Sequence, residues 1–115
     1  MVPAGPTDTE LKAQVGSTIQ AYANALEAGN IARVRQIYPG MPTQREQQLR
    51  NALPEMRNLQ VQLTVGQVDL NGDNATARVS GRWVFNQGGQ RTVLPADNTY
   101  VLERRGAGWV ITEIR

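Results

Sequence analysis

The sequence has 115 residues, which suits one compact domain and leaves no room for two. Its 12 Lys and Arg residues, against 10 Asp and Glu, are scattered along the chain, without the basic block or aromatic track expected of a nucleic-acid surface. Cysteine and histidine are both absent, which excludes disulfides, zinc sites of the Cys/His kind and nucleophile systems that use an imidazole base.

We therefore expect no metal, no cofactor and no nucleic-acid partner. Any general acid or base must be a carboxylate, a tyrosine or Lys12, the only lysine. No apolar run approaches the ~20 residues of a membrane span, so this segment is not expected to insert into a membrane. Without cysteine, the sequence gives no indication of redox compartment, and cytoplasmic and extracytoplasmic locations both stay open.

Residues 1–7 are interpreted as a linker or N-terminal arm, because MVPAGP contains prolines and a glycine and has no apolar periodicity. Residues 8–115 are expected to form a single domain. A linker before the domain and a strand pattern that runs to Arg115 suggest the C-terminal part of a longer protein. An ordinary frayed N-terminus is the alternative.

The first half of the domain is predicted to contain three helices. Thr7 to Glu10 fits a capping box, and the helix behind it buries a stripe at helical spacing, namely Leu11, Val15, Ile19, Tyr22 and Leu26. Gly29 suits the end of this helix and Asn30 the cap of a second one, which buries Ile31, Val34 and Tyr38. Thr43 to Glu46 fits a second capping box, and the third helix is expected to end or kink at Pro54.

From Leu59 the apolar period changes to two, which predicts a sheet of four antiparallel strands at about 59–70, 76–85, 91–103 and 109–115. The alternation changes phase at Gly66, as it does at a β-bulge. A hairpin turn is predicted at 71–74. In the second strand, the odd-numbered residues from Ala77 to Phe85 are expected to face the helices.

The last two strands carry consecutive apolar residues, Tyr100 to Leu102 and Trp109 to Ile111, so apolar side chains point to both faces of the sheet. The outer face must then be covered by a loop or by a partner, because sizeable exposed apolar patches usually mark interfaces. We favour a homodimer over cover from within the chain. Its predicted interface includes Tyr100, Leu102 and Val110.

The segment TIQAYANALEAGNIARVRQIY, followed by strands that close on GWVITEIR, resembles the NTF2-like superfamily, which includes SnoaL-like and ketosteroid-isomerase-like domains. The matching positions are Tyr22, Ala25, Leu26, Gly29, Asn30, Tyr38, Trp109, Ile111 and Ile114. The resemblance covers about Leu11 to Arg115. It implies an α+β cone, in which three N-terminal helices pack on a curved antiparallel four-stranded sheet and leave a cavity at the open end. Because this fold hosts enzymes, carriers and association modules, the resemblance does not specify an activity.

Aromatic residues on the helix-facing side are expected to fill or line this cavity. The predicted lining consists of Tyr22, Leu26, Tyr38, Trp83, Phe85 and Trp109. With Tyr22 and an arginine as polar points, such a pocket would suit a small apolar or weakly anionic ligand. Packing in a closed core is the alternative, because buried tyrosines and tryptophans usually supply packing area.

Tyr22 matches the helix position of the tyrosine that stabilises the oxyanion in ketosteroid isomerases, so the resemblance implies a partner carboxylate as base. By resemblance, this base lies in a segment shortly after the second helix. Glu46 is close to that segment, although the predicted capping box would place it at the start of the third helix. Asp97 lies in LPADNTY, where it could reach a pocket rim. We expect no catalytic residues, with Tyr22 and either Asp97 or Glu46 as the enzymatic alternative.

The leading interpretation is therefore a non-catalytic accessory domain of a larger bacterial signalling or envelope protein. It would dimerise and could sense a small molecule; by resemblance, such modules follow kinase or membrane-anchored segments. The alternative is a small SnoaL-like isomerase, cyclase or hydratase. A third interpretation, a designed scaffold of this fold, is suggested by the paired capping boxes.

Overall fold

The computed structural model of the chain describes residues 7–106 and 108–115. It shows three helices, α1 (Asp8–Glu27), α2 (Ile31–Ile37) and α3 (Thr43–Ala52), and a short 3-10 helix, η1 (Leu53–Glu55). Five strands follow, namely β1 (Arg57–Asn71), β2 (Asn74–Gln87), β3 (Gln90–Pro95), β4 (Asn98–Arg105) and β5 (Gly108–Ile114). All strand pairs are antiparallel, so the predicted α+β class is confirmed, with five strands in place of four. Residues 1–6 of the predicted linker lie outside the described residues.

Local sequence signals set the boundary between α1 and α2. The Thr7 hydroxyl accepts a hydrogen bond from the Glu10 amide at 3.2 Å, and Asn30 Oδ1 accepts one from the Arg33 amide at 3.1 Å. Between the two helices, Gly29 has a φ of 68°, in the left-handed region that glycine adopts without strain. Thr7 and Asn30 are therefore confirmed as the N-caps of the two helices, and of the predicted Thr7–Glu10 capping box the structure shows the half in which the Thr7 hydroxyl accepts.

The second predicted capping box is wrong. Thr43 is already the first residue of α3, the N-cap is Pro42, and no side chain caps this helix. The Glu46 carboxylate instead forms ion pairs with Arg35 and Arg50, each at 3.5 Å. The C-terminal end of α3 agrees with the prediction of a stop or kink at Pro54, because α3 ends at Ala52 and Pro54 lies within η1.

The sheet has the order β1–β2–β4–β5, and β3 pairs with the remaining length of β2. A register shift between Val65 and Val68 confirms the bulge expected at Gly66. The predicted third strand is divided into β3 and β4. Both pair with β2 in a single register, since Arg82 lies opposite Pro95 and Val79 lies opposite Asn98. Pro95, which has no N–H to donate, ends β3.

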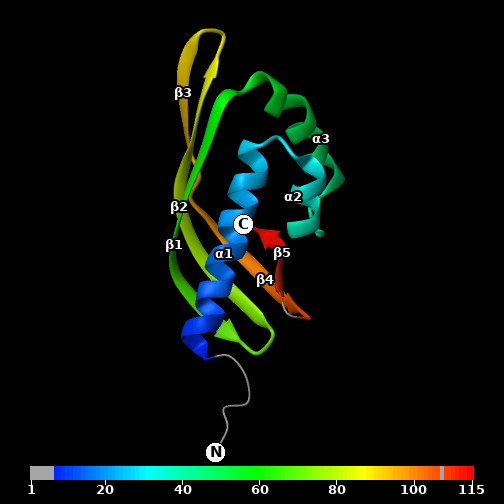
Figure 1. Cartoon of the computed structure of the whole chain (residues 1–115), viewed down its shortest axis with the longest axis vertical. Helices are drawn as coiled ribbons and strands as arrows, with labels where there is room; N and C mark the ends of the chain where they lie inside the picture. Colours follow the sequence, from blue (N-terminus) through cyan, green and yellow to red (C-terminus); the bar gives the residue numbers. More distant parts are fainter. Residues whose placement is uncertain (1–6, 107) are drawn as a thin grey trace, which may run out of the picture.

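The helices cover the face of the sheet that carries Ala75, Ala77 and Val79 of β2, all of them buried. The predicted odd-numbered inner face of β2 is therefore confirmed along this part of the strand. α1 packs against β1 and β5, α2 packs against α1 and β5, and α3 packs against α2. Figure 1 shows these layers and the β2–β3 hairpin, which extends past the helices.

The structure corrects the predicted dimer interface, because two of its three residues point toward the helices and away from the outer face. Tyr100 lies opposite Ala77 and Leu102 opposite Ala75, so both face the helices and are 4% and 0% exposed. A bulge after Val101 shifts the register between β4 and β5 at this point. Of the three predicted interface residues, only the half-buried Val110 belongs to the outer face.

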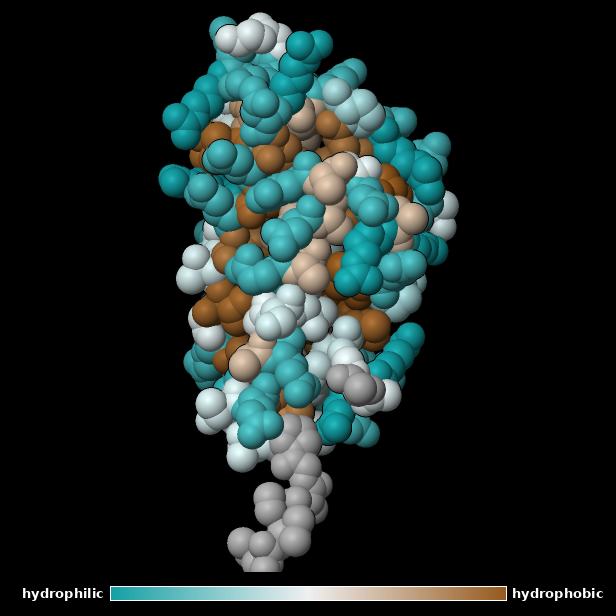
Figure 2. Space-filling model, in the orientation of Figure 1, coloured by the Kyte–Doolittle hydropathy of each residue, from teal (hydrophilic) through white to brown (hydrophobic). Residues whose placement is uncertain are grey.

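The surface around α3 differs from the tip of the hairpin. Figure 2 shows hydrophobic side chains between polar groups in the half of the molecule that carries α3, whereas the tip is polar. In the part of the chain that the structure describes, no helix combines the length and the apolar character needed to cross a membrane.

Candidate functional site: a tyrosine cleft

The three tyrosines of the chain meet inside the cone. Tyr22 comes from the buried stripe of α1, Tyr38 follows α2, and Tyr100 comes from the inner face of β4. The Tyr22 ring meets Tyr38 with centroids 6.3 Å apart and Tyr100 with centroids 5.9 Å apart, edge to face in both pairs. This geometry is favourable for aromatic pairs and fixes the three rings relative to one another.

These rings form one wall of a cavity of about 230 Å³, named here the tyrosine cleft. Arg45 of α3, Trp83 of β2 and Asn98 of β4 are among its other lining residues. An adjoining cavity of about 390 Å³, the outer cavity, shares Arg45, Trp83, Ala96 and Asn98 with the cleft and runs along α3 toward β3. Together they give the open end of the cone enough room for a small organic molecule.

Two hydroxyls of the cleft, those of Tyr22 and Tyr100, have a raised pKa. Burial raises the pKa of Tyr22 above its ordinary value of 10.0, although the nearby Arg45 charge and its hydrogen bond with the hydroxyl oppose this effect. Burial likewise raises the pKa of Tyr100, with a further contribution from Tyr22. At neutral pH both groups therefore carry a proton that they can donate to a ligand.

The charge of the cleft is positive. Among the described residues, Arg45 has no carboxylate within ion-pair distance, and no Asp or Glu belongs to the lining of the cleft. The Asn98 amide is held by the backbone, since its Nδ2 donates to the Arg115 carbonyl at 3.0 Å. A guanidinium and phenolic O–H groups thus favour a ligand that accepts hydrogen bonds.

The structure separates the two carboxylates of the enzymatic alternative from Tyr22. Glu46 is held by Arg35 and Arg50 and does not line the cleft. The exposed Asp97 accepts a long hydrogen bond of 3.4 Å from the Gly81 amide and lines a different hollow, together with Arg78 and Arg115. No group of three or more Asp and Glu residues lies together within residues 7–106 and 108–115.

The six residues predicted to line one pocket are distributed over the molecule. Tyr22, Tyr38 and Trp83 line the tyrosine cleft. Leu26 lines a second cavity, at the end of α1. Phe85 is buried in the β2–β3 arm, outside the lining of the cleft and of the outer cavity. Trp109 fills the core, where its Nε1 donates to Gln14 Oε1 at 3.1 Å.

Sequence reasoning missed Tyr100, Arg45 and Asn98 as lining residues. Tyr100 is one of three consecutive apolar residues, so the sequence does not indicate which face of the sheet its side chain takes. The structure pairs Tyr100 with the buried Ala77, which places it on the inner face. Arg45 is exposed and lies in the polar first turn of α3, where no periodic signal marks it. Its position depends on how α3 crosses the mouth of the cone.

Solved structures with this fold come with several different functional names. A Streptomyces avermitilis protein named provisionally as a dehydratase of the NTF2-like family has 18% identity, a TM-score of 0.78 and coverage of 95% of this chain and 96% of that one. A ketosteroid isomerase-like protein of Erwinia carotovora has 17% identity, a TM-score of 0.70 and coverage of 94% and 95%. A Xanthomonas campestris protein, named provisionally as a calcium/calmodulin dependent protein kinase II association domain, has 21% identity, a TM-score of 0.69 and coverage of 100% and 89%.

At these identities the structural likenesses establish the fold and leave the activity open. No curated protein matches the sequence. The family profile of the SnoaL-like domain matches residues 28–115, which is most of the chain and includes α2, α3 and the whole sheet. The chain therefore belongs to the SnoaL-like domain family, within the NTF2-like superfamily.

Proposed function

We propose that this domain binds a small apolar or weakly anionic molecule in the tyrosine cleft without transforming it, as an accessory domain of a larger bacterial protein. The observation that carries the proposal is the meeting of Tyr22, Tyr100 and Arg45 around a cavity that no Asp or Glu of the described residues lines. Rings and aliphatic walls supply apolar contact, and the polar groups supply hydrogen-bond donors.

A non-catalytic role fits the distance between Tyr22, the candidate acid, and the two carboxylates that could act as a base. Proton abstraction next to a carbonyl needs a base within hydrogen-bond reach of the substrate, opposite the group that stabilises the oxyanion. Tyr22 could serve as the donor, but Glu46 is engaged by two arginines and Asp97 lines another hollow. The cleft thus has an oxyanion-binding side and lacks a facing carboxylate among the described residues.

Calorimetric titration with benzoate and with benzyl alcohol tests the binding proposal. Both probes combine an aromatic ring with one oxygen-bearing group, and only benzoate is charged. We expect both to bind, and Arg45→Gln to weaken benzoate about tenfold, because a hydrogen bond to a charged group contributes about 1.5–3 kcal/mol and the exposure of Arg45 to water places it at the lower end of this range. Arg33→Gln, on the exposed surface of α2, is the matched control and should change neither affinity. Failure of both probes to bind at millimolar concentration would contradict the proposal.

Hydrogen–deuterium exchange of an enolisable ketone separates binding from catalysis. 2-Tetralone incubated with the protein in D2O should exchange its α-protons no faster than in buffer alone, since the cleft offers no base. An acceleration that Tyr22→Phe abolishes would support the isomerase, cyclase or hydratase alternative instead.

The accessory role has support in one structural neighbour, whose name describes it as an association domain of a kinase. Homodimerisation through the outer face of the sheet belongs to the same proposal. After the correction of Tyr100 and Leu102, its apolar support is Val110, Val101 and Val93, the last of them 50% exposed. The face also carries polar side chains, including Gln62 and Arg82, which bond to each other.

Light scattering at micromolar concentration tests the dimer. We expect a mass twice that of the 12.6 kDa chain, and a return to monomer on Val110→Lys, which places a charge on the outer face. Lys at the already exposed Gln90 is the control. A monomeric wild-type protein would remove dimerisation from the proposal and leave the ligand-binding part intact.

A further inference from the structure

A second cavity of about 430 Å³ lies at the end of α1, outside the tyrosine cleft. It is bounded by the end of α1, the start of α2, the α3–η1 segment and the start of β1, and is named here the leucine cavity. It shares no lining residue with the cleft, and it meets the outer cavity only at Leu49 and Met56. Its contents can therefore be tested separately from those of the cleft.

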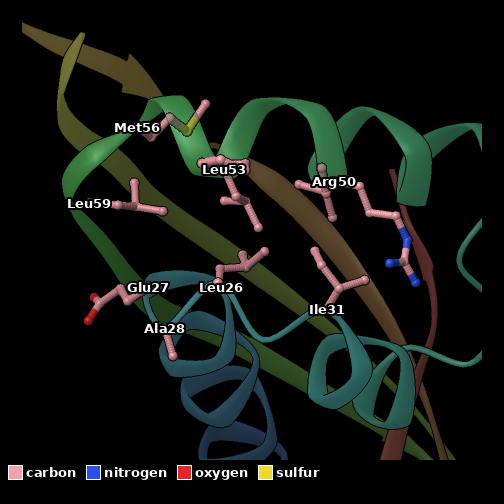
Figure 3. Close-up of a pocket in the computed structure, with 11 residues that line it drawn as sticks. Leu26, Glu27, Ala28, Ile31, Arg50, Leu53, Met56 and Leu59 are labelled. Atoms are coloured by element: carbon pink, nitrogen blue, oxygen red, sulfur yellow. The ribbon is translucent and has the colours of Figure 1, made fainter.

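Four apolar side chains face one another across the leucine cavity. Figure 3 shows Leu26, Leu53, Leu59 and Ile31 directed toward one another across the cavity, from four different elements. Leu26 and Leu53 are buried, and Ile31 and Leu59 are half-buried at the edge of the core. An apolar chain placed beside Ile31 and Leu59 would remove their exposed apolar surface from water, which stabilises the complex by roughly 25 cal/mol per Å².

Two charged residues lie at opposite ends of the cavity in Figure 3, Glu27 and Arg50. The Glu27 side chain points away from the interior, and its carboxylate accepts a hydrogen bond from the Val61 amide at 2.8 Å. Glu27 thereby joins α1 to β1. Because Glu27 points away from the cavity, Arg50 at the opposite end is the charged residue considered for binding a ligand.

The positive charge at Arg50 is only partly balanced. Glu46 is shared between Arg35 and Arg50, each at 3.5 Å, so one carboxylate faces two guanidinium groups. Arg35 is also fixed by a 2.7 Å hydrogen bond from its Nη1 to the Met41 carbonyl. Arg50 reaches Glu46 through Nε, which leaves its two terminal nitrogens to bind another anion.

We propose that the leucine cavity binds an amphiphile with one apolar chain and one terminal carboxylate. The chain lies between Ile31, Leu53 and Leu59, and the carboxylate binds the guanidinium of Arg50. This site does not depend on the proposed function of the tyrosine cleft.

Calorimetric titration of the intact chain with octanoate, octanol and octylamine tests the proposal. The three probes share a chain length and differ in the charge of the end group. We expect octanoate to bind about three- to tenfold more tightly than octanol, because Arg50 is partly exposed and water screens part of its attraction. Octylamine should bind most weakly. Octanol binding as tightly as octanoate, or no binding of octanoate at millimolar concentration, would overturn the proposal.

Two variants of arginine test the role assigned to the charge. Arg50→Gln should reduce the affinity for octanoate to that for octanol and leave octanol unchanged. Arg33→Gln, also on the helical surface but outside the cavity, should preserve the preference. An unchanged preference in Arg50→Gln would contradict the placement of the carboxylate.

Two bulky variants test the location. Ile31→Trp fills the leucine cavity from its rim and should abolish octanoate binding, whereas Ala96→Phe fills the tyrosine cleft and the outer cavity and should preserve it. Circular dichroism checks that each variant folds, and Leu59→Phe replaces Ile31→Trp if the latter does not. The opposite pattern, with loss only in Ala96→Phe, would place octanoate in the cleft and overturn the proposal.

Discussion

The half of the molecule built by α1, β4, β5 and the adjoining part of β2 is filled, whereas the half that carries α3 and the β2–β3 arm is hollow. In the filled half, Ile19, Leu102 and Ile111 are all 0% exposed. In the hollow half, α3 buries only Leu49 and borders cavities of about 430 and 390 Å³. Tyr22 of α1 and Tyr100 of β4 lie where the two halves meet, because both are buried in the core and both line the tyrosine cleft.

Alanine substitutions of matched leucines should show this difference most strongly. Leu102→Ala empties a fully enclosed position and is expected to reduce the free energy of unfolding by about 3–5 kcal/mol. Leu49→Ala should cost less, about 1–2 kcal/mol, because Leu49 already borders two cavities and loses fewer contacts. Urea denaturation of both variants measures the two values. Equal losses would break the distinction between the two halves.

A glycine in β2 provides the second test of close packing. A Cβ atom at Gly81 would clash with the Gln62 carbonyl oxygen, a contact with the backbone of β1 that a rotamer change cannot relieve. Gly81→Ala should therefore destabilise the protein by about 2–3 kcal/mol. At Gly66 the nearest atom to an added Cβ is the Arg78 carbonyl oxygen at 3.4 Å, so Gly66→Ala is the control and should cost under about 1 kcal/mol. A tolerated Gly81→Ala would show that the two strands can separate there.

The buried tyrosines predict how stability responds to alkaline pH. The pKa values of Tyr22 and Tyr100 are raised in the folded state by burial, so unfolding lets both hydroxyls ionise more easily. Their contribution is fully present below pH 10, the ordinary value, and is lost as the pH rises above it, by up to about 1.4 kcal/mol per pH unit for each group.

Urea denaturation at pH 8, 10 and 11 measures this slope. Tyr22→Phe removes one of the two groups and should make the decline between pH 10 and 11 less steep. A decline of the same steepness in wild type and variant would contradict the burial of the Tyr22 hydroxyl in the folded state.

Tyr22→Phe should also have the smallest effect on stability and a selective effect on binding. The ring and its edge contacts with Tyr38 and Tyr100 remain, so the free energy of unfolding near pH 7 should change by less than about 1 kcal/mol. Benzoate affinity should fall about fivefold because one donor is lost. Tyr38→Phe is the comparison for a second hydroxyl of the same cleft. An unchanged affinity in both variants would place the carboxylate of benzoate elsewhere.

In the filled half, α1 and the adjoining part of β2 could be predicted from sequence because their residues obey simple periods. The α1 stripe placed Ile19 and Tyr22 inside, and the odd-numbered residues of β2 placed Ala77 and Val79 there. The break between β3 and β4 was missed, although Pro95, which ends β3, marks it in the sequence. The face of the sheet to which Tyr100 points could not be predicted, since Tyr100 to Leu102 are consecutive apolar residues without the alternation of a strand.

The binding groups were harder to predict than the core. Arg45 reaches the cleft only because α3 crosses the open end of the cone, a tertiary arrangement that its polar sequence does not encode by periodicity. Glu46 shows the converse: TQRE matches a capping box, yet Arg35 of α2 and Arg50 of α3 draw its carboxylate into ion pairs. Local motifs at the hollow end thus compete with tertiary contacts that the sequence pattern does not reveal.

Intermolecular nuclear Overhauser measurements on the benzoate complex test the central claim most directly. The aromatic protons of benzoate should show contacts with the rings of Tyr22, Tyr100 and Trp83, and the ligand should be recovered chemically unchanged. Contacts confined to other parts of the surface, with the three rings unaffected by benzoate, would contradict the assignment of the tyrosine cleft as the binding site.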